Sequence, residues 1–222
     1  MARAPRGTAV MSDARTAILN RVRQAERTGR VPVAAQPVRI PASAASTAEE
    51  RLRRFVDELT ALGVEPYVEA SAAGVRERVA ALIAGRSVFS WDPEWLPYDV
   101  GSVLAEAIHG DSPRDRQAGA EIGVTGCDAA LAETGTLVLL SGPGRPRAAS
   151  LLPPIHLAVV RGAELRFGAE EYFRERGGAI ASAACCTFVT GPSRTADIEL
   201  TLTLGVHGPG RVLVVVGPIE SA

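Results

Sequence analysis

The sequence contains no lysine: its 24 Lys and Arg residues are all arginine, set against 25 acidic residues. This absence excludes Schiff-base chemistry and the lysine of a phosphate-binding P-loop. Aromatic residues make up only 5% of the chain and the formal net charge is −1. A nucleic-acid binder usually carries a basic stripe and aromatic rings on which bases stack, so we expect no nucleic-acid partner.

Cysteine is also scarce. Cys127, Cys185 and Cys186 are too few for a disulfide framework, which indicates a reducing compartment, and too few for the four thiolates of a conventional iron–sulfur cluster. We therefore expect no cofactor in this chain. The three histidines, His109, His156 and His207, are too scattered to predict a metal triad, and His156 has the apolar neighbours of a core residue.

Long apolar runs are missing as well. The longest uncharged stretch, residues 177–193, is interrupted by Gly, Ser, Thr and Pro, so we expect no membrane span. The first ten residues lack the apolar segment of a secretory signal. Together with the few cysteines, these features predict a cytoplasmic protein.

The length of 222 residues and the 46% of hydrophobic residues fit one domain with an appendage. Ser12 can cap a helix that runs to about Arg27, and a Pro- and Ala-rich stretch follows. We therefore predict an N-terminal helical arm over residues 1–45 and a compact domain over residues 46–222. The arm is expected to fold back on its own body or to reach a partner chain, which makes a homo-oligomer possible.

The compact domain begins with two overlapping capping boxes, Ser46 with Glu49 and Thr47 with Glu50. Apolar residues at helical spacing follow, and Gly63 stands where a helix ends. A strand over 64–68, a helix over 74–84 and a strand over 87–90 alternate in the manner of an α/β fold with parallel pairs. Further strands are expected at 122–125, 136–140, 156–160, 187–190 and 212–216, with a helix over 168–176. The short connections around Thr136 predict that part of the sheet is antiparallel.

Three segments share the pattern Gly-Pro-x-Arg, at residues 142–145, 191–194 and 208–211. The first two follow predicted strands, and ligands bind at the carboxyl edge of open α/β sheets. Glycine permits close backbone approach and arginine clamps a carboxylate or a phosphate. The pattern is equally a simple turn signal, so a turn and an anion site both remain open.

The segment 191–199 is richer in polar groups. It suggests a strand end, a tight turn and a helix start, with Ser193 or Thr195 as N-cap and free N–H groups that favour an anion. Asp197 and Glu199 would complement the helix dipole or, alternatively, orient Arg194.

Glu133 lies between two apolar runs, residues 129–132 and 137–140. A carboxylate partly buried by such neighbours has a raised pKa or needs a donor, as a general base or a carboxylate nucleophile requires. A structural glutamate bonded to backbone N–H groups would have the same pattern.

Several of these segments together resemble the LUD domain family, in the short single-domain form of lactate utilization protein C. They are Gly123–Thr125, Asp128–Leu139, Ser150–His156, Thr190–Glu199 and Gly205–Pro209, and the resemblance covers about residues 46–218. It implies a three-layer α/β/α sandwich similar to glucosamine-6-phosphate deaminase, ribose-5-phosphate isomerase and CoA transferases. It also implies work beside an iron–sulfur subunit and a Cys-rich subunit that oxidise L-lactate to pyruvate, with the clusters in those partners.

Carried over onto this sequence, the family motif points to Glu133, Thr134, Gly135, Thr136, Gly191, Pro192, Ser193, Arg194, Thr195, Asp197, His207 and Gly208. Glu133 and His207 are the proton-handling candidates, and the others are candidates for holding a small carboxylate or phosphate. Two alternatives stay open. One is a stand-alone CoA transferase or sugar-phosphate isomerase that uses Glu133, and the other is a non-catalytic scaffold or regulator.

Overall fold

The computed structural model describes residues 8–28, 46–104, 106–195 and 203–219 of the chain. Contacts within the chain divide it into two units, residues 1–41 and 42–222. In the first unit, helix α1 (Thr8–Thr28) contains the helix predicted from Ser12. Among the helices that the structure describes, none combines the length and apolar character that crossing a bilayer requires.

The second unit is built on a parallel sheet of five strands, in the order β1-β11-β6-β3-β2. The strands are β1 (Glu65–Val68), β2 (Val88–Ser90), β3 (Ile122–Thr125), β6 (Ile155–Val160) and β11 (Arg211–Val216). All five lie at the predicted positions, and the predicted α/β class with parallel pairs is confirmed.

A second, mixed sheet has the order β7-β4-β5-β8. Its strands are β4 (Ala129–Leu131), β5 (Thr136–Ser141), β7 (Leu165–Arg166) and β8 (Cys185–Val189). β5 is antiparallel to both of its neighbours, so the antiparallel pairing expected around Thr136 forms a separate sheet. A two-stranded ribbon, β9 (Arg194–Thr195) with β10 (Thr203–Leu204), completes the described strands.

The helices of the second unit are α2 (Ala48–Ala61), α3 (Ala72–Ile83), α4 (Arg114–Ala118) and α5 (Ala169–Ser182). Short 3-10 turns are η1 (Pro93–Trp95), η2 (Pro97–Val103), η3 (Arg147–Ser150) and η4 (Gly162–Glu164). Of the two possible capping boxes at the start of α2, the one between Thr47 and Glu50 forms. Gly63 follows the C-cap of α2 with a φ of +79°, which a residue without Cβ adopts at little cost.

Alternating side chains along β11 separate two cores. Leu213 and Val215 pack with Val75 of α3 on one face of the parallel sheet. Val212, Val214 and Val216 face the other way, into a core shared with α2 and with Leu137 of the second sheet. Burying each such side chain contributes roughly 2 kcal/mol. The second sheet therefore covers the same face of the parallel sheet as α2.

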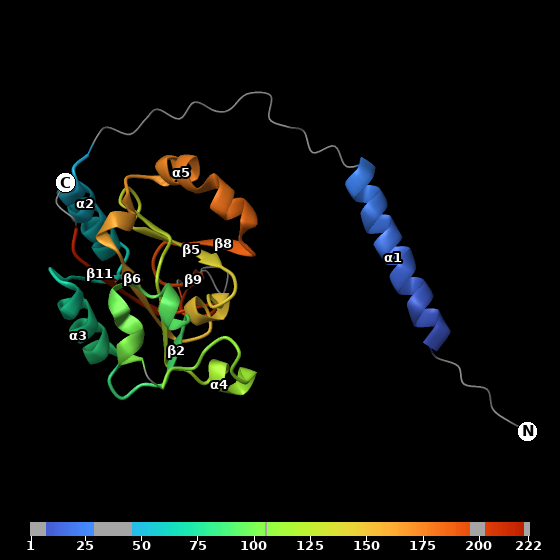
Figure 1. Ribbon diagram of the computed structural model, residues 1–222, viewed down its shortest axis with the longest axis horizontal. Helices are drawn as coiled ribbons and strands as arrows, with labels where there is room; N and C mark the ends of the chain where they lie inside the picture. The colour runs from blue at the N-terminus through green and yellow to red at the C-terminus, as the bar shows by residue number, and fades with distance from the viewer. Residues whose placement is uncertain (1–7, 29–45, 105, 196–202, 220–222) are drawn as a thin grey trace, which may run out of the picture. The chain divides into compact units, whose positions relative to one another are not determined.

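Helix α5 covers the second sheet. Tyr172 of α5 is fully buried against Val138 of β5 and Leu131 of β4, and Figure 1 shows α5 beside β5 and β8. The turns after β2 and β5 lie together at a cavity of the domain.

Candidate functional site

The three Gly-Pro-x-Arg segments form turns, and each arginine has a partner within the protein. Arg145 donates to Asp128 at 3.0 Å, and its guanidinium lies 4.3 Å from the ring centre of Trp95. Arg211 makes two parallel hydrogen bonds, of 2.6 and 2.8 Å, to the carboxylate of Glu65 on β1. These bonds hold the pKa of Glu65 below its usual value. Arg194 donates instead to a neutral acceptor, the carbonyl oxygen of Leu62 at the end of α2.

The turn at residues 133–136 joins β4 to β5 and carries a chain of hydroxyl groups. Thr134 and Thr136 are hydrogen bonded at 2.7 Å, and Thr136 is bonded in turn to Thr190 at 2.9 Å. Gly135 packs against the backbone of Glu58 in α2. Glu133 itself is exposed, so the prediction of a carboxylate buried by its apolar neighbours is wrong. Those neighbours lie on β4 and β5 and point into the cores, whereas the turn directs Glu133 outward.

In the segment after β8, the prediction of a helix start with Ser193 as N-cap is wrong, whereas the residues that would follow Thr195 as N-cap lie outside the described residues. Arg194 and Thr195 are extended and pair antiparallel with Leu204 and Thr203. The described residues of this segment therefore begin a ribbon, because cross-strand pairing outweighs the local preference of Ser and Thr for helix caps. Pro192 is buried, and Asp197 lies outside the described residues.

The second and third Gly-Pro turns lie side by side. The N–H group of Ser193 donates to the carbonyl oxygen of Pro209 at 2.9 Å, and Gly205 donates to Ser193 at 3.0 Å. Gly208 faces the side chain of Ser193, while His207 is exposed on the same loop. The motif residues Gly191 to Arg194 and Gly208 thus gather in one group of loops, and Gly191 and Arg194 reach the end of α2 at Leu62.

His156 is the fully buried histidine of the parallel sheet. It lies on β6, and its Nε2 is 2.9 Å from Oγ1 of Thr125. Among the described residues, its Nδ1 has no hydrogen-bond partner. Burial lowers the pKa of His156 to about 4, because the charged imidazolium loses its hydration. The ring is therefore neutral at physiological pH, as expected for a core histidine.

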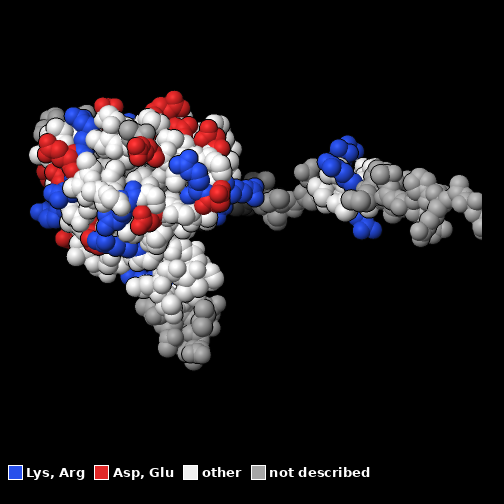
Figure 2. Space-filling view, turned by 90° about the horizontal axis from the view of Figure 1, so that it is seen from below, with Lys and Arg blue, Asp and Glu red and all other residues white. Residues whose placement is uncertain are grey.

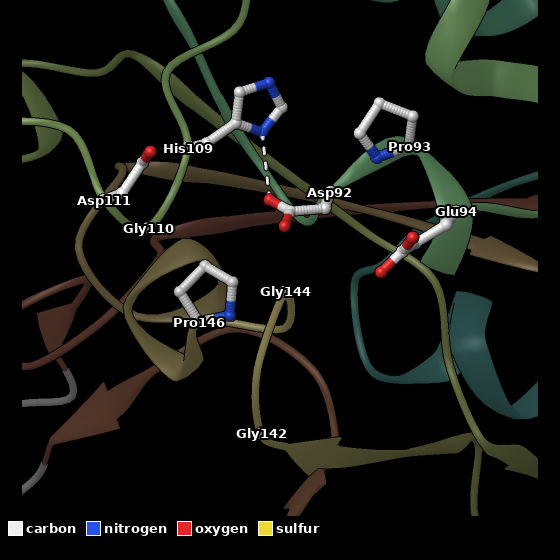
Figure 3. Close-up of a pocket in the computed structure, with 9 residues that line it drawn as sticks. All are labelled: Asp92, Pro93, Glu94, His109, Gly110, Asp111, Gly142, Gly144 and Pro146. Carbon is white, nitrogen blue, oxygen red and sulfur yellow. Dashed lines mark ion pairs between the residues drawn. The ribbon is translucent and has the colours of Figure 1, made fainter.

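A cavity of about 760 Å³ lies beside the turns after β2 and β5. Its lining residues are Asp92, Pro93, Glu94, His109, Gly110, Asp111, Gly142, Gly144 and Pro146, drawn in Figure 3. Asp92 follows the end of β2 and donates its N–H to the carbonyl oxygen of Gly144 at 2.8 Å. His109 is brought to the same place because Ile108 pairs with Phe89 of β2.

In this cavity the imidazole of His109 lies against two polar groups. Its Nδ1 is 3.5 Å from Oδ1 of Asp92 and 3.5 Å from Oγ of Ser90. A carboxylate beside Nδ1 favours the tautomer that carries its proton there, which leaves Nε2 as a proton acceptor. Both side chains of the ion pair are partly exposed, His109 by 30% and Asp92 by 42%. A histidine held by a carboxylate at the border of an open cavity has the surroundings that a general base requires.

Neither His109 nor Asp92 was predicted from the sequence as a site residue. The two are 17 positions apart in loops, and no motif joins them. One signal was present, since Asp92 stands two residues after a predicted strand of a parallel sheet, where ligands bind. The pairing of Ile108 with β2, which brings His109 near, has no equivalent signal because it is a single bridge outside any strand.

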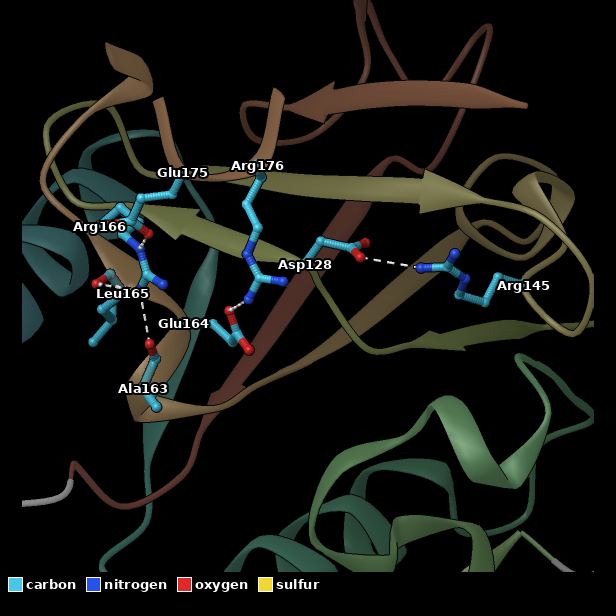
Figure 4. Close-up of polar contacts among 8 residues, drawn as sticks. All are labelled: Asp128, Arg145, Ala163, Glu164, Leu165, Arg166, Glu175 and Arg176. Carbon is cyan, nitrogen blue, oxygen red and sulfur yellow. Dashed lines mark hydrogen bonds and ion pairs between the residues drawn. The ribbon is translucent and has the colours of Figure 1, made fainter. Parts of the chain in front are cut away.

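A smaller cavity of about 400 Å³ lies between the end of α5 and the turn after β5, lined in part by Asp128 and Arg145. Figure 4 shows this ion pair and the pairs of Glu164 with Arg176 and of Glu175 with Arg166. Asp128 also accepts the N–H of Leu140 at 2.8 Å. Burial nevertheless raises the pKa of Asp128, outweighing these two partners. Within the described ranges, no three His, Cys, Asp or Glu side chains lie close enough to hold a metal ion.

The comparisons with known proteins agree with the motifs. The model of the LUD domain matches residues 88–216, which is more than half of the chain. The chain belongs to the LUD domain family. The matched region includes the cavity of His109 and Asp92 and the turns at residues 133–136, 191–195 and 207–208, and it excludes α1, α2 and α3.

Several similar proteins are named lactate utilization protein C. The protein from Halalkalibacterium halodurans is 36% identical over 145 residues, which cover 60% of this chain and 63% of that protein. The protein from Geobacillus sp. is 33% identical over 172 residues, or 67% and 70% of the two chains. The chain thus spans less than two thirds of the first of these relatives.

A solved structure supports the fold of this LUD protein. The crystal structure of a DUF162 family protein from Deinococcus radiodurans superimposes with a TM-score of 0.64 and 25% sequence identity. The match covers 78% of this chain and 99% of that one. The arrangement of a parallel sheet with a second, mixed sheet is therefore shared with an experimental structure.

Proposed function

We propose that this protein serves L-lactate utilization, as the subunit without a cluster in an iron–sulfur-dependent system that oxidises lactate to pyruvate. The observation that carries the proposal is the 33% identity, over 70% of its length, to a relative named lactate utilization protein C. The partners proposed are the iron–sulfur and Cys-rich subunits, which hold the clusters. The fold proposed for the domain is a variant of the three-layer α/β/α sandwich of sugar-phosphate isomerases and CoA transferases.

Arg194 is the proposed holder of a small carboxylate or phosphate. Its guanidinium is exposed, and its described partner is the neutral carbonyl oxygen of Leu62. Within the described residues, an anion can therefore add a charge-assisted hydrogen bond to Arg194 without displacing a carboxylate. The neighbouring Ser193 and Thr195 and the threonine chain that starts at Thr134 are further donors in the same group of loops.

For proton transfer we propose His109 with Asp92 beside the two candidates of the family motif, Glu133 and His207. The residues that line the cavity of His109 include neither of these two candidates nor Arg194. Oxidation of an alcohol to a ketone releases two protons with two electrons, so a base is needed. His109 faces a large cavity and has a carboxylate at Nδ1, whereas Glu133 and His207 are exposed. Three carboxylates, of Asp92, Glu94 and Asp111, line the cavity, so a lactate anion fits there only beside a compensating cation.

The test is lactate oxidation by the chain together with its partner subunits. We expect His109→Gln to lower the rate by about a hundredfold, the usual effect of losing a general base. Arg194→Ala should raise the lactate concentration needed for half the maximal rate. His207→Gln serves as the matched comparison for His109→Gln, and a loss confined to His207→Gln would move proton transfer to that residue.

Two outcomes would contradict the proposal itself. One is lactate-dependent growth that is unchanged after deletion of the gene for this chain. The other is wild-type oxidation by the partner subunits alone. Wild-type activity of a folded Arg194→Ala variant would contradict only the role of Arg194.

A further inference from the structure

The charge of the chain is divided between its two units. Residues 1–41 contain eight arginines and two acidic residues, whereas residues 42–222 contain 16 arginines and 23 acidic residues. With neutral histidines, the first unit carries a net charge of +6 and the second a net charge of −7. The near-zero total therefore conceals a basic arm and an acidic body. Figure 2 shows arginine side chains on the described part of α1.

Helix α1 also presents an apolar stripe. Ala14, Ile18, Val22 and Ala25 follow one another at intervals of four, four and three residues, which places them on one side of an α-helix. Ile18 is 61% exposed and Val22 is 51% exposed. A short stripe of this kind is typical of a helix that packs against another protein surface, since an isolated amphipathic helix gains little stability in water.

The charges beside the stripe indicate what kind of surface covers it. Arg15 and Arg21 lie on its two sides, by the same helical spacing. Helix α1 contains four arginines and two acidic residues, which gives it a net charge of +2, so pairing of α1 with another α1 would bring two positively charged helices together. The surface that fits is acidic with apolar contacts, and the acidic body of this chain has the required sign.

We propose that α1 docks through this stripe on the acidic body, residues 42–222, of a second copy of the chain. The product is a dimer in which each copy contributes its arm to the other. The 17 residues between α1 and residue 46 can span at most about 60 Å when extended, which is enough to reach a neighbouring domain of this size. Two symmetric contacts of opposite charge then hold the dimer.

The first test measures the molar mass of the full chain by light scattering during gel filtration, at micromolar concentration. We expect a dimer at 50 mM salt and a dissociation constant at least about tenfold weaker at 500 mM, because salt screens the charge attraction. Ile18→Asp should yield a monomer. Asn20→Asp adds the same charge on the opposite side of α1 and should remain dimeric. A monomeric wild-type chain, or equal behaviour of the two variants, would overturn the proposal.

The second test identifies the docking partner of α1. A photoreactive residue replaces Leu19, which is 41% exposed beside the stripe. Isotopically heavy and light chains are mixed, irradiated and digested. We expect mixed heavy–light cross-links between residue 19 and peptides of residues 46–222. Cross-links within one chain only, or only between two α1 helices, would contradict the exchange of arms. Neither test depends on the proposed role in lactate utilization.

Discussion

The buried imidazole of His156 should make the stability of this protein depend on pH in the mildly acidic range. The folded pKa is about 4, against 6.5 for an unperturbed histidine. Between these two values the unfolded chain binds a proton that the folded chain does not. The free energy of unfolding therefore falls as the pH drops, by about 1.4 kcal/mol per pH unit from this residue. The loss begins near pH 6.5, ends near pH 4 and totals roughly 3 kcal/mol.

The assay compares urea unfolding of the wild type with that of His156→Gln between pH 5 and pH 7.5. Glutamine stays neutral throughout and retains a polar group near Thr125, the partner of Nε2. At pH 7 the variant should be the less stable protein, since it loses the fitted ring. By pH 5 the difference in the free energy of unfolding between the two proteins should shrink by about 2 kcal/mol, because only the wild type loses stability when the unfolded chain binds a proton at this position. Because the wild type and the variant share all other titrating groups, the contributions of those groups cancel in the difference between the two free energies of unfolding.

The matched control is His207→Gln, which changes an exposed histidine and should keep a constant gap to the wild type. A constant gap for His156→Gln as well would refute the reasoning. It would mean that the folded protein accepts the proton on His156, with a rearranged Thr125 or with water at Nδ1.

Two further stability predictions rest on pairs of neighbouring or similar residues. Thr47→Ala should lower the free energy of unfolding by about 1 kcal/mol, because the cap of α2 is lost. Ser46→Ala should leave the free energy of unfolding unchanged, since Ser46 is not the N-cap. Equal losses of stability in thermal unfolding would contradict this assignment of the cap. Gly123→Ala should destabilise by more than about 3 kcal/mol, since the new Cβ would lie 1.7 Å from the carbonyl oxygen of Ala149. Gly177→Ala, in the open part of α5, should instead stabilise the protein by roughly 0.5–1 kcal/mol. Thermal unfolding of both glycine variants, followed by circular dichroism, measures the two changes in stability.

Strands β3, β6 and β11 of the parallel sheet could be predicted because each is a short β-branched run bounded by Gly or Pro, and β1 and β2 could be predicted from their alternation with helices. Strand β4 was missed, since Ala129, Ala130 and Leu131 have little strand preference of their own. It is held by pairing on both sides, with β5 and β7. The ribbon that begins at Arg194 was mistaken for a helix start for a related reason, because its pairing partner lies eight positions or more further along the chain. Local preference fails where distant pairing decides the structure.

The candidate site was predictable to a similar degree. The motif residues around Gly191 and Gly208 do meet, because both segments are turns beside strand ends. The cavity of His109 and Asp92 was not predictable from spacing, as it depends on one bridge between Ile108 and β2. The apolar residues on either side of Glu133 in the sequence do not determine whether Glu133 is buried. Those residues belong to the two strands β4 and β5, and the tight turn that joins the strands directs Glu133 outward.

The three Gly-Pro-x-Arg turns differ in the partner that each arginine has among the described residues. For Arg145 and Arg211, an incoming anion must compete with the carboxylates of Asp128 and Glu65. Displacing Asp128 would leave a carboxylate without its cation in a place where burial already raises its pKa. Arg194 bonds a carbonyl oxygen at the end of α2, so an anion there adds a full charge where only a partial one was present. Tetrapeptides of one pattern thus differ in the partner that the fold supplies. Among the described residues, Arg194 is the arginine of the three without a carboxylate partner, which supports its proposed role in holding an anion.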